Sequence, residues 1–211
     1  MKSTYFTLIL VLLILNCSGS KHLKNDFFSS EEKKLIMDAD SLTPLRVFKI
    51  TNKSDSLLLR TKSTYIKPEP GNIVLRNFVK RLYATVKDSM SMGVGIAAPQ
   101  VGVLKNIIWV QRFDKENLPF EVYLNPKIVK YSTQTQTVIE GCLSIPDRSE
   151  TLNSRSQEIS IEYHTIDGEL AAEKVKGFTA VVFQHEIDHL NGILYLDHLQ
   201  KEINDTKKSS L

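Results

Sequence analysis

The sequence has few cysteines, little excess of charge of either sign and no long hydrophobic run. Its two cysteines, Cys17 and Cys142, are too few among 211 residues for a scaffold stabilised by disulfides. The 27 Lys and Arg residues nearly balance the 24 Asp and Glu residues, for a formal net charge of +3, so we expect no nucleic-acid partner. Hydrophobic residues make up 42% of the chain, which excludes a mostly disordered or fibrous protein.

An unbroken run of eleven residues without charge spans residues 5–15, shortly after Lys2. Its eleven residues are too few to cross a bilayer as a helix but suit the core of a signal peptide. Cys17 comes next, so the segment resembles a bacterial lipoprotein signal, although Asn16 stands where Gly, Ala or Ser is usual. We therefore expect a signal peptide over 1–16 and a lipid anchor on Cys17. The alternatives are an uncleaved hydrophobic anchor and a plain signal peptide with a chance cysteine.

The rest of the sequence divides into a polar stretch, a compact domain and a short end. We expect a tether over 17–44, the compact domain over 45–200 and a frayed polar tail over 201–211. The anchor would place this domain in the cell envelope, outside the cytoplasmic membrane. If the signal is not used, the protein is cytoplasmic.

The spacing of apolar residues predicts two helical segments in the compact domain, with strands between them. One helix begins after Gly71 and ends near Ser91, and the other segment spans residues 178–199. Asp167 and Gly168 fit the turn of a hairpin. This order predicts an α+β fold. The strands are expected at 107–111, 121–124, 137–140, 158–164 and 169–175, and the first helix has Leu75, Phe78, Val79, Leu82 and Val86 on its apolar face, with Arg76, Lys80, Arg81 and Lys87 between them.

The second helical segment contains the pattern H-E-x-x-H, formed by His185, Glu186 and His189. Residues four apart lie on one face of a helix, so the two imidazoles can bind one metal ion. Glu186 is offset around the helix and can accept a proton from a metal-bound water. The alternative is two buried histidines that are each satisfied by a carboxylate or a backbone group.

A catalytic metal site built on two histidines needs a third protein ligand. Thermolysin-like peptidases supply a downstream Glu, where only Glu202 remains, and metzincins supply a His where this chain has Tyr195. His198 is expected to be exposed near the end of the helix. Cys142 remains as a strong candidate, because a thiolate binds zinc or ferrous iron. Two other interpretations of Cys142 stay open: a small buried hydrophobe, and a nucleophile with a distant His as base.

Residues 93–102 contain three glycines and two alanines, and Gln100 is their only polar side chain. Such a segment lets the backbone approach a ligand closely while one amide provides direction. It lacks the Lys-Ser/Thr pair of a phosphate loop. Taken alone, it fits a plain bend between a helix and a strand best.

Three segments together resemble the motifs of the peptide deformylase family. Residues 93–100 match its GxGxAAPQ loop, 140–144 its EGCLS segment and 184–190 its QHExDHL helix, in the family's order. The weaker flanking motifs are at 55–60 and 123–126, so the resemblance covers about 45–200. On this basis the chain is identified as a member of the family.

The resemblance implies an α+β fold in which antiparallel or mixed sheets surround a central metal-binding helix that bears HExxH. It implies one metal ion per chain, bound by Cys142, His185 and His189. Ferrous iron (Fe2+) would be the native metal, with Zn2+ or Ni2+ able to substitute. The implied reaction removes the N-formyl group from N-formyl-methionyl peptides and releases formate. We expect a monomer.

The same resemblance assigns roles to further residues. Glu186 would activate the metal-bound water, and the Gln100 side chain and the Leu143 backbone N–H would hold the oxyanion. Gly95 and Val94 would contact the peptide. The expected walls of the methionine pocket are Val94, Val138, Phe178 and Val182.

Two features depart from the family's usual pattern. An Arg commonly follows the cysteine motif near the pocket, and here both Arg148 and Arg155 are candidates. An anchored deformylase outside the cytoplasm would meet released or secreted formyl peptides rather than nascent chains. The alternative functions are therefore another metallo-amidase or peptidase acting outside the cytoplasm, and an anchored binding protein without catalysis.

Overall fold

The computed structural model describes residues 27–88 and 93–209. The predicted signal peptide and Cys17 lie outside these residues. Among the helices described, none combines the length and the apolar character needed to cross a membrane.

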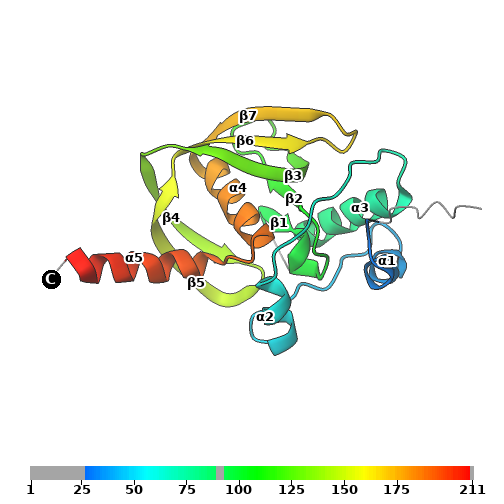
Figure 1. Cartoon of the computed structure of the whole chain (residues 1–211), viewed down its shortest axis with the longest axis horizontal. Coiled ribbons are helices and arrows are strands. Elements are labelled where there is room, and N and C mark those ends of the chain that lie inside the picture. Colours follow the sequence, from blue (N-terminus) through cyan, green and yellow to red (C-terminus); the bar gives the residue numbers. More distant parts are fainter. Residues whose placement is uncertain (1–26, 89–92, 210–211) are drawn as a thin grey trace, which may run out of the picture.

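Two antiparallel sheets form the framework of the described residues (Figure 1). The larger sheet has the strand order β1-β2-β3-β6-β7, while β4 and β5 pair in a separate hairpin. The predicted α+β class is confirmed, with antiparallel pairing between all the strands described here. The strands are β1 (Gly95–Ala97), β2 (Ile107–Gln111), β3 (Phe120–Tyr131), β4 (Thr135–Cys142), β5 (Ile145–Ser156), β6 (Glu158–His164) and β7 (Leu170–Lys176).

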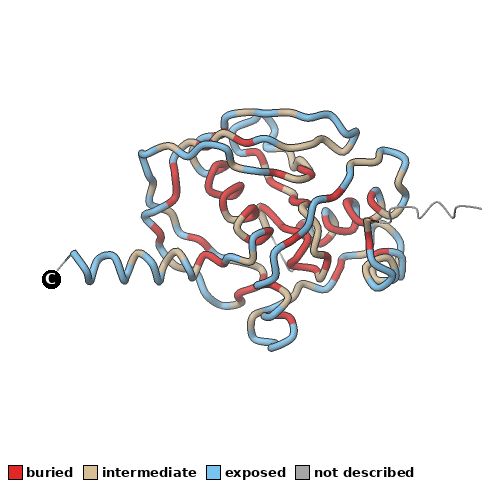
Figure 2. Tube along the Cα trace, viewed as in Figure 1, coloured by how far each residue is buried: buried red, intermediate tan, exposed pale blue. Residues whose placement is uncertain are grey.

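Helix α4 lies between the two sheets, and helix α5 projects away from the body of the molecule (Figure 1). Val182, Phe183 and Ile187 of α4 pack into a cluster with Ile108 and Val110 of β2, and Figure 2 shows the buried residues concentrated along these elements. Burying side chains of this size contributes about 1.5–3 kcal/mol each. The helices are α1 (Ser30–Met37), α2 (Lys53–Leu59), α3 (Ile73–Lys87), the short 3-10 helix η1 (Ala98–Val101), α4 (Gly177–Leu190) and α5 (Tyr195–Ser209).

The predicted first helix corresponds to α3, and its five apolar residues are buried as expected. Arg81 was expected on its polar face, but only 3% of it is exposed. Its guanidinium donates to the carbonyl oxygens of Leu35, Ile36 and Thr43. The long, flexible side chain of Arg81 thus ties the preceding segment to α3.

The predicted tether is wrong over its described part, because residues 27–44 pack against the domain. Ile36 of α1 and Phe28 before it are buried in the core cluster that includes α3. Ser29 caps α1 in a reciprocal capping box with Glu32. The packed part of the chain therefore begins before the boundary predicted at Leu45.

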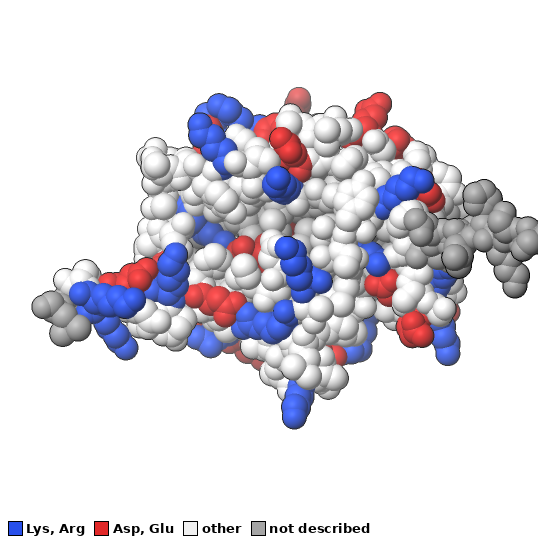
Figure 3. All heavy atoms as spheres, in the orientation of Figure 1, with Lys and Arg blue, Asp and Glu red and all other residues white. Residues whose placement is uncertain are grey.

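The C-terminal prediction also needs correction, because residues 178–199 do not form one helix. The chain leaves α4 at Asn191, turns at Gly192 with φ of +72°, and continues into α5. A Cβ on Gly192 would clash with the carbonyl oxygen of Arg60, so only glycine fits this turn. The predicted frayed tail is helical to Ser209, and charged side chains of both signs cover it (Figure 3).

Candidate active site

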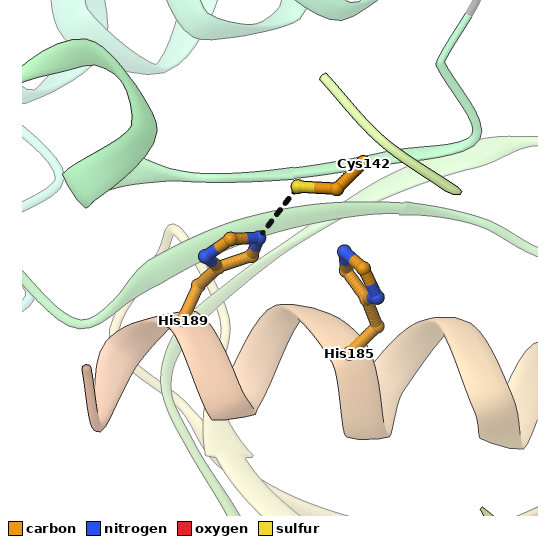
Figure 4. Close-up of side chains that lie close together, drawn as sticks. All are labelled: Cys142, His185 and His189. Atoms are coloured by element: carbon orange, nitrogen blue, oxygen red, sulfur yellow. Dashed lines mark hydrogen bonds between the residues drawn. The ribbon is translucent and has the colours of Figure 1, made fainter. Parts of the chain in front are cut away.

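Helix α4 and the end of β4 bring the three predicted ligand residues together. His185 and His189 lie one turn apart on α4 and face Cys142, the last residue of β4 (Figure 4). The Sγ atom of Cys142 is 3.2 Å from Nε2 of His189. One ligand atom from each of the three residues lies within 4.8 Å of the others.

The surroundings of Cys142 favour its thiolate form. Burial alone would raise the pKa of this thiol, but the adjacent His189 and His185 lower it well below its usual value. The backbone N–H of Ser144 and Nε2 of Gln100 also lie near its sulfur, at 3.4 and 3.5 Å. A thiolate and two imidazoles match the ligand preferences of zinc and ferrous iron, so the residues present fit the metal that the family resemblance implies.

Glu140 orients His185. Its Oε2 lies 2.8 Å from Nδ1 of His185, which leaves Nε2 as the nitrogen free to bind a metal. Burial alone would raise the pKa of Glu140, but hydrogen bonds from His185 and Arg155 lower it to about 2. Glu140 is therefore a buried carboxylate, only 5% exposed, with a fixed geometry.

Glu186 lies beside the three candidate ligands but is not one of them. Burial raises its pKa to about 7, and its Oε2 is buried with no hydrogen-bond partner among the described residues. Because an unsatisfied buried oxygen is costly, this atom is suited to a water or substrate in the cleft. A Cβ on Gly95 would lie 2.5 Å from the other oxygen of Glu186, so the glycine leaves room for this carboxylate.

Both ends of the Gln100 side-chain amide have hydrogen-bond partners, and the residue lies in η1. Its Oε1 accepts from the backbone N–H of Ala97 at 2.8 Å, while Nε2 points toward Cys142 and lies 3.3 Å from Oγ of Ser144. Gln100 is 2% exposed, so the direction of its amide is fixed. The loop that fitted a plain bend best when taken alone therefore brings its polar group to the candidate ligands.

These residues line a cleft of about 600 Å³. Its lining includes most of the residues singled out in the sequence, but Val138 and the buried His189 are absent from it, and Ile139 takes the place of Val138. Val138 and Ile139 are adjacent in β4, so their side chains point to opposite faces of the strand, and Ile139 is the one on the side of the cleft. The predicted site residues in the lining are Val94, Gly95, Gln100, Cys142, Leu143, Phe178, Val182, His185 and Glu186.

Of the two candidate arginines, only Arg148 lines the cleft. Arg148 lines the cleft with its side chain half exposed. Arg155 is 3% exposed and lies behind the site, where it donates to Glu140 and Asp188. No pattern in the sequence indicated that Arg155, Asp188 and His198 meet, since they lie in different elements.

A model of the polypeptide deformylase family matches residues 47–205, which is most of the chain. The chain belongs to the polypeptide deformylase family. Deformylases are metal-dependent hydrolases that remove the N-formyl group from formylmethionine peptides during protein biosynthesis, and this chain is an enzyme of that class.

Individual deformylases resemble the chain over most of their length. It is 38% identical over 155 residues to the peptide deformylase of Desulforudis audaxviator (strain MP104C), covering 72% of this chain and 94% of the relative. Two solved structures of the class I type b deformylase from Acinetobacter baumannii each match 74% of this chain and 98% of their own. The Met-Ala-Ser-bound form is 32% identical with a TM-score of 0.63, and the actinonin-bound form is 31% identical with a TM-score of 0.64.

Proposed function

We propose that this deformylase works in the cleft beside α4, with one divalent metal ion held by Cys142, His185 and His189. The supporting observation is the convergence of these three ligand atoms within 4.8 Å at the cleft. Ferrous iron is the proposed native metal, and zinc or nickel can replace it, since one thiolate and two imidazoles suit all three. The HExxH segment of α4 is thus proposed as the metal-binding element.

The metal supplies Lewis acidity toward water and the formyl carbonyl. Glu186 accepts the proton of the attacking water through its unpartnered Oε2 and passes it to the departing amine. Its pKa of about 7 suits both halves of this transfer. Nε2 of Gln100 and the backbone N–H of Leu143 donate to the developing oxyanion, a contribution of about 3 kcal/mol per donor.

The walls of the cleft suit a methionyl peptide. Val94, Phe178, Val181 and Val182 give it an apolar side, which fits an unbranched thioether side chain. Gly95 lies beside them and can contact the peptide backbone without a side chain between them. The Met-Ala-Ser bound to the Acinetobacter baumannii deformylase supports a peptide of this kind as the substrate class.

Formate release from formyl-Met-Ala-Ser, compared with its acetyl analogue and unformylated Met-Ala-Ser, tests the activity. The iron-loaded enzyme is expected to hydrolyse the formyl peptide alone. Hydrolysis of the acetyl peptide or of the Met-Ala bond instead would indicate another metallo-amidase or a peptidase. Measuring the release of each product from each peptide makes these outcomes distinguishable.

Two substitutions test the roles of the residues. Glu186→Ala is expected to retain the metal and to lower kcat/KM by several orders of magnitude, whereas Cys142→Ser is expected to lower the bound metal per chain. Substantial activity in Glu186→Ala would remove Glu186 from its role in proton transfer. Unchanged metal content in Cys142→Ser would refute the thiolate ligand.

We also propose that the enzyme is a monomer anchored in the cell envelope through a lipid on Cys17, where it acts on released formyl peptides. The uncharged run at 5–15 and the cysteine that follows it support this placement. Labelling with radioactive palmitate should mark the wild type and Cys142→Ser but not Cys17→Ala. An unlabelled wild-type protein in the soluble fraction would overturn the anchor.

A further inference from the structure

A buried chain of hydrogen bonds runs from the candidate metal ligand His185 to His198 on α5. Glu140 lies 2.8 Å from His185 and accepts from Nε of Arg155 at 2.6 Å and from Nη2 at 3.0 Å. Nη1 of Arg155 donates to Oδ2 of Asp188 at 2.6 Å, and Nε2 of His198 lies 2.8 Å from the same oxygen. We call Glu140, Arg155, Asp188 and His198 the Arg155 network.

Because the network is buried, its side chains have little freedom to move. The side chains of Glu140, Arg155 and Asp188 are 4%, 3% and 15% exposed. Charges in such surroundings tolerate little displacement, because each lost hydrogen bond leaves a charge without water or a partner. Arg155 uses one edge of its guanidinium for Glu140 and one nitrogen for Asp188, so the position of Asp188 constrains the angle at which Arg155 meets Glu140.

His198 occupies the outer end of the network. It lies in the first turns of α5, not near the end of the preceding helix as expected, and its side chain is 29% exposed. Arg155, Asp188 and His198 also line a second cavity of about 320 Å³ that contains side chains of α5 such as Glu202 and Lys201. Without the imidazole of His198, Oδ2 of Asp188 would face this cavity. It would then accept a hydrogen bond from mobile water instead of from Nε2 of His198, whose position is fixed.

We propose that His198 is a positioning residue for the metal site, which acts on His185 through Asp188, Arg155 and Glu140. The inference rests on the proposed role of His185 as a ligand. His198 touches neither substrate nor metal. It fixes Asp188, which holds Arg155 at the angle that presents Glu140 to Nδ1 of His185, and this hydrogen bond orients the ring. A helix at the far end of the chain thereby helps to set the geometry of the active site.

The test uses the full chain loaded with cobalt(II), and compares His198→Ala with His198→Gln and Leu199→Ala. The side-chain amide that His198→Gln introduces would keep a donor near the place of Nε2. Leu199 lies beside His198 on α5 and packs against the cluster formed by Ile145, Leu152, Leu194 and Tyr195, so its truncation weakens the docking of α5 without touching the network. The measurements are the cobalt dissociation constant by chelator competition, the cobalt–thiolate absorption, and kcat and KM for formyl-Met-Ala-Ser.

Partners hydrogen-bonded directly to metal ligands commonly affect metal affinity by 10–100-fold, so we expect about tenfold weaker cobalt binding for the more remote His198→Ala. Its cobalt absorption should shift, and kcat should fall while KM stays within about twofold of wild type. His198→Gln should restore all three properties toward wild type, and Leu199→Ala should lower Tm without changing them.

The inference is overturned if His198→Ala binds cobalt with wild-type affinity and absorption, or if Leu199→Ala reproduces its losses. A wild-type protein that binds no cobalt, or a Cys142→Ser variant that binds it normally, would contradict the proposed ligand set instead. The two failures are therefore distinguishable.

Discussion

Two buried arginines lie near α4 and have similar surroundings but different connections. Arg112 and Arg155 are 2% and 3% exposed, and each is surrounded by carboxylates. Arg112 donates to Asp114, Glu121, Tyr123 and Glu173, which we call the Arg112 network. The Arg155 network continues through Glu140 to His185, whereas the hydrogen bonds described for the Arg112 network do not reach Cys142, His185 or His189.

The comparison separates structural from functional uses of the same interaction. The Arg112 network joins the end of β2 to β3 and β7, with the guanidinium 5.7 Å from the ring centroid of Phe183 on α4. It therefore connects three strands of the large sheet to one another. The Arg155 network joins the β4–β5 hairpin to α4 and α5, and the candidate metal ligands lie on two of these elements, β4 and α4. Burial alone therefore does not identify a functional residue. What distinguishes the Arg155 network is that it ends at His185, a candidate metal ligand.

The largest expected effect comes from removing each guanidinium in turn. Arg112→Met and Arg155→Met should each lower the free energy of unfolding by about 3–5 kcal/mol, because buried carboxylates lose their partner. Urea denaturation measures this loss. Only Arg155→Met should also weaken metal binding, measured as metal per folded chain.

Arg155→Lys provides a second variant in case Arg155→Met does not fold. It keeps the charge but not the bidentate contact with Glu140, so it should fold and still lose metal affinity. If Arg112→Met loses metal affinity to the same extent while folded, the distinction between the two networks is wrong.

The second prediction compares one carboxylate from each network. Glu140→Gln removes the charge that orients His185 and should weaken metal binding by about 10–100-fold. Glu173→Gln makes the matched change beside Arg112 and should leave metal affinity within about twofold. Chelator competition on both variants measures this, and equal affinities would mean that Glu140 does not act on the ligand.

The arrangement of the site residues on α4 was predictable from the sequence, because the spacing of residues along a helix determines which of them share a face. His185 and His189 share a face through their separation of four residues, and Glu186 is offset as expected. The resemblance to known motifs added Cys142 and Gln100. Neither source indicated the Arg155 network, because it joins residues of β4, β5, α4 and α5 whose contacts depend on tertiary packing.

The N- and C-terminal segments were mispredicted for a related reason. The four consecutive charged residues at 31–34 made the first segment (27–44) look polar, and residues 201–209 of the second (195–209) contain a single apolar side chain, Ile203. The first is held by Phe28, Ile36 and the hydrogen bonds of Arg81. The second is docked in part by Glu202, which accepts from the backbone N–H groups of Asn153 and Ser154 in β5. A few specific long-range contacts outweighed the local composition.

The third prediction concerns the loss of thermal stability at low pH, to which both networks should contribute in the same way. A hydrogen bond from Arg112 lowers the pKa of Asp114, and although burial alone would raise the pKa of Asp188, His198 and Arg155 lower it. Carboxyls with lowered folded-state pKa values stabilise the protein above their unfolded pKa of about 3.9, and this stability is lost as the pH falls below it. Tm should therefore drop less steeply below pH 4 in Asp114→Asn and Asp188→Asn than in wild type.

The two variants should differ at pH 7, where Asp188→Asn alone weakens metal binding. An unchanged slope of Tm against pH in both variants would show that these carboxyls do not contribute to acid sensitivity.

The smallest effect is expected for an exposed ion pair, which tests whether burial rather than charge pairing makes the two networks strong. Nζ of Lys176 lies 2.9 Å from Oε2 of Glu158, with side chains 72% and 33% exposed. Water screens such a pair and ordering the lysine costs entropy, so Lys176→Met should shift Tm by about 2 °C or less and leave metal binding unchanged. A shift as large as that of Arg112→Met would mean that charge pairing, irrespective of burial, stabilises this fold. The functional difference between the networks would then depend solely on the hydrogen bond that Nδ1 of His185 donates to Glu140.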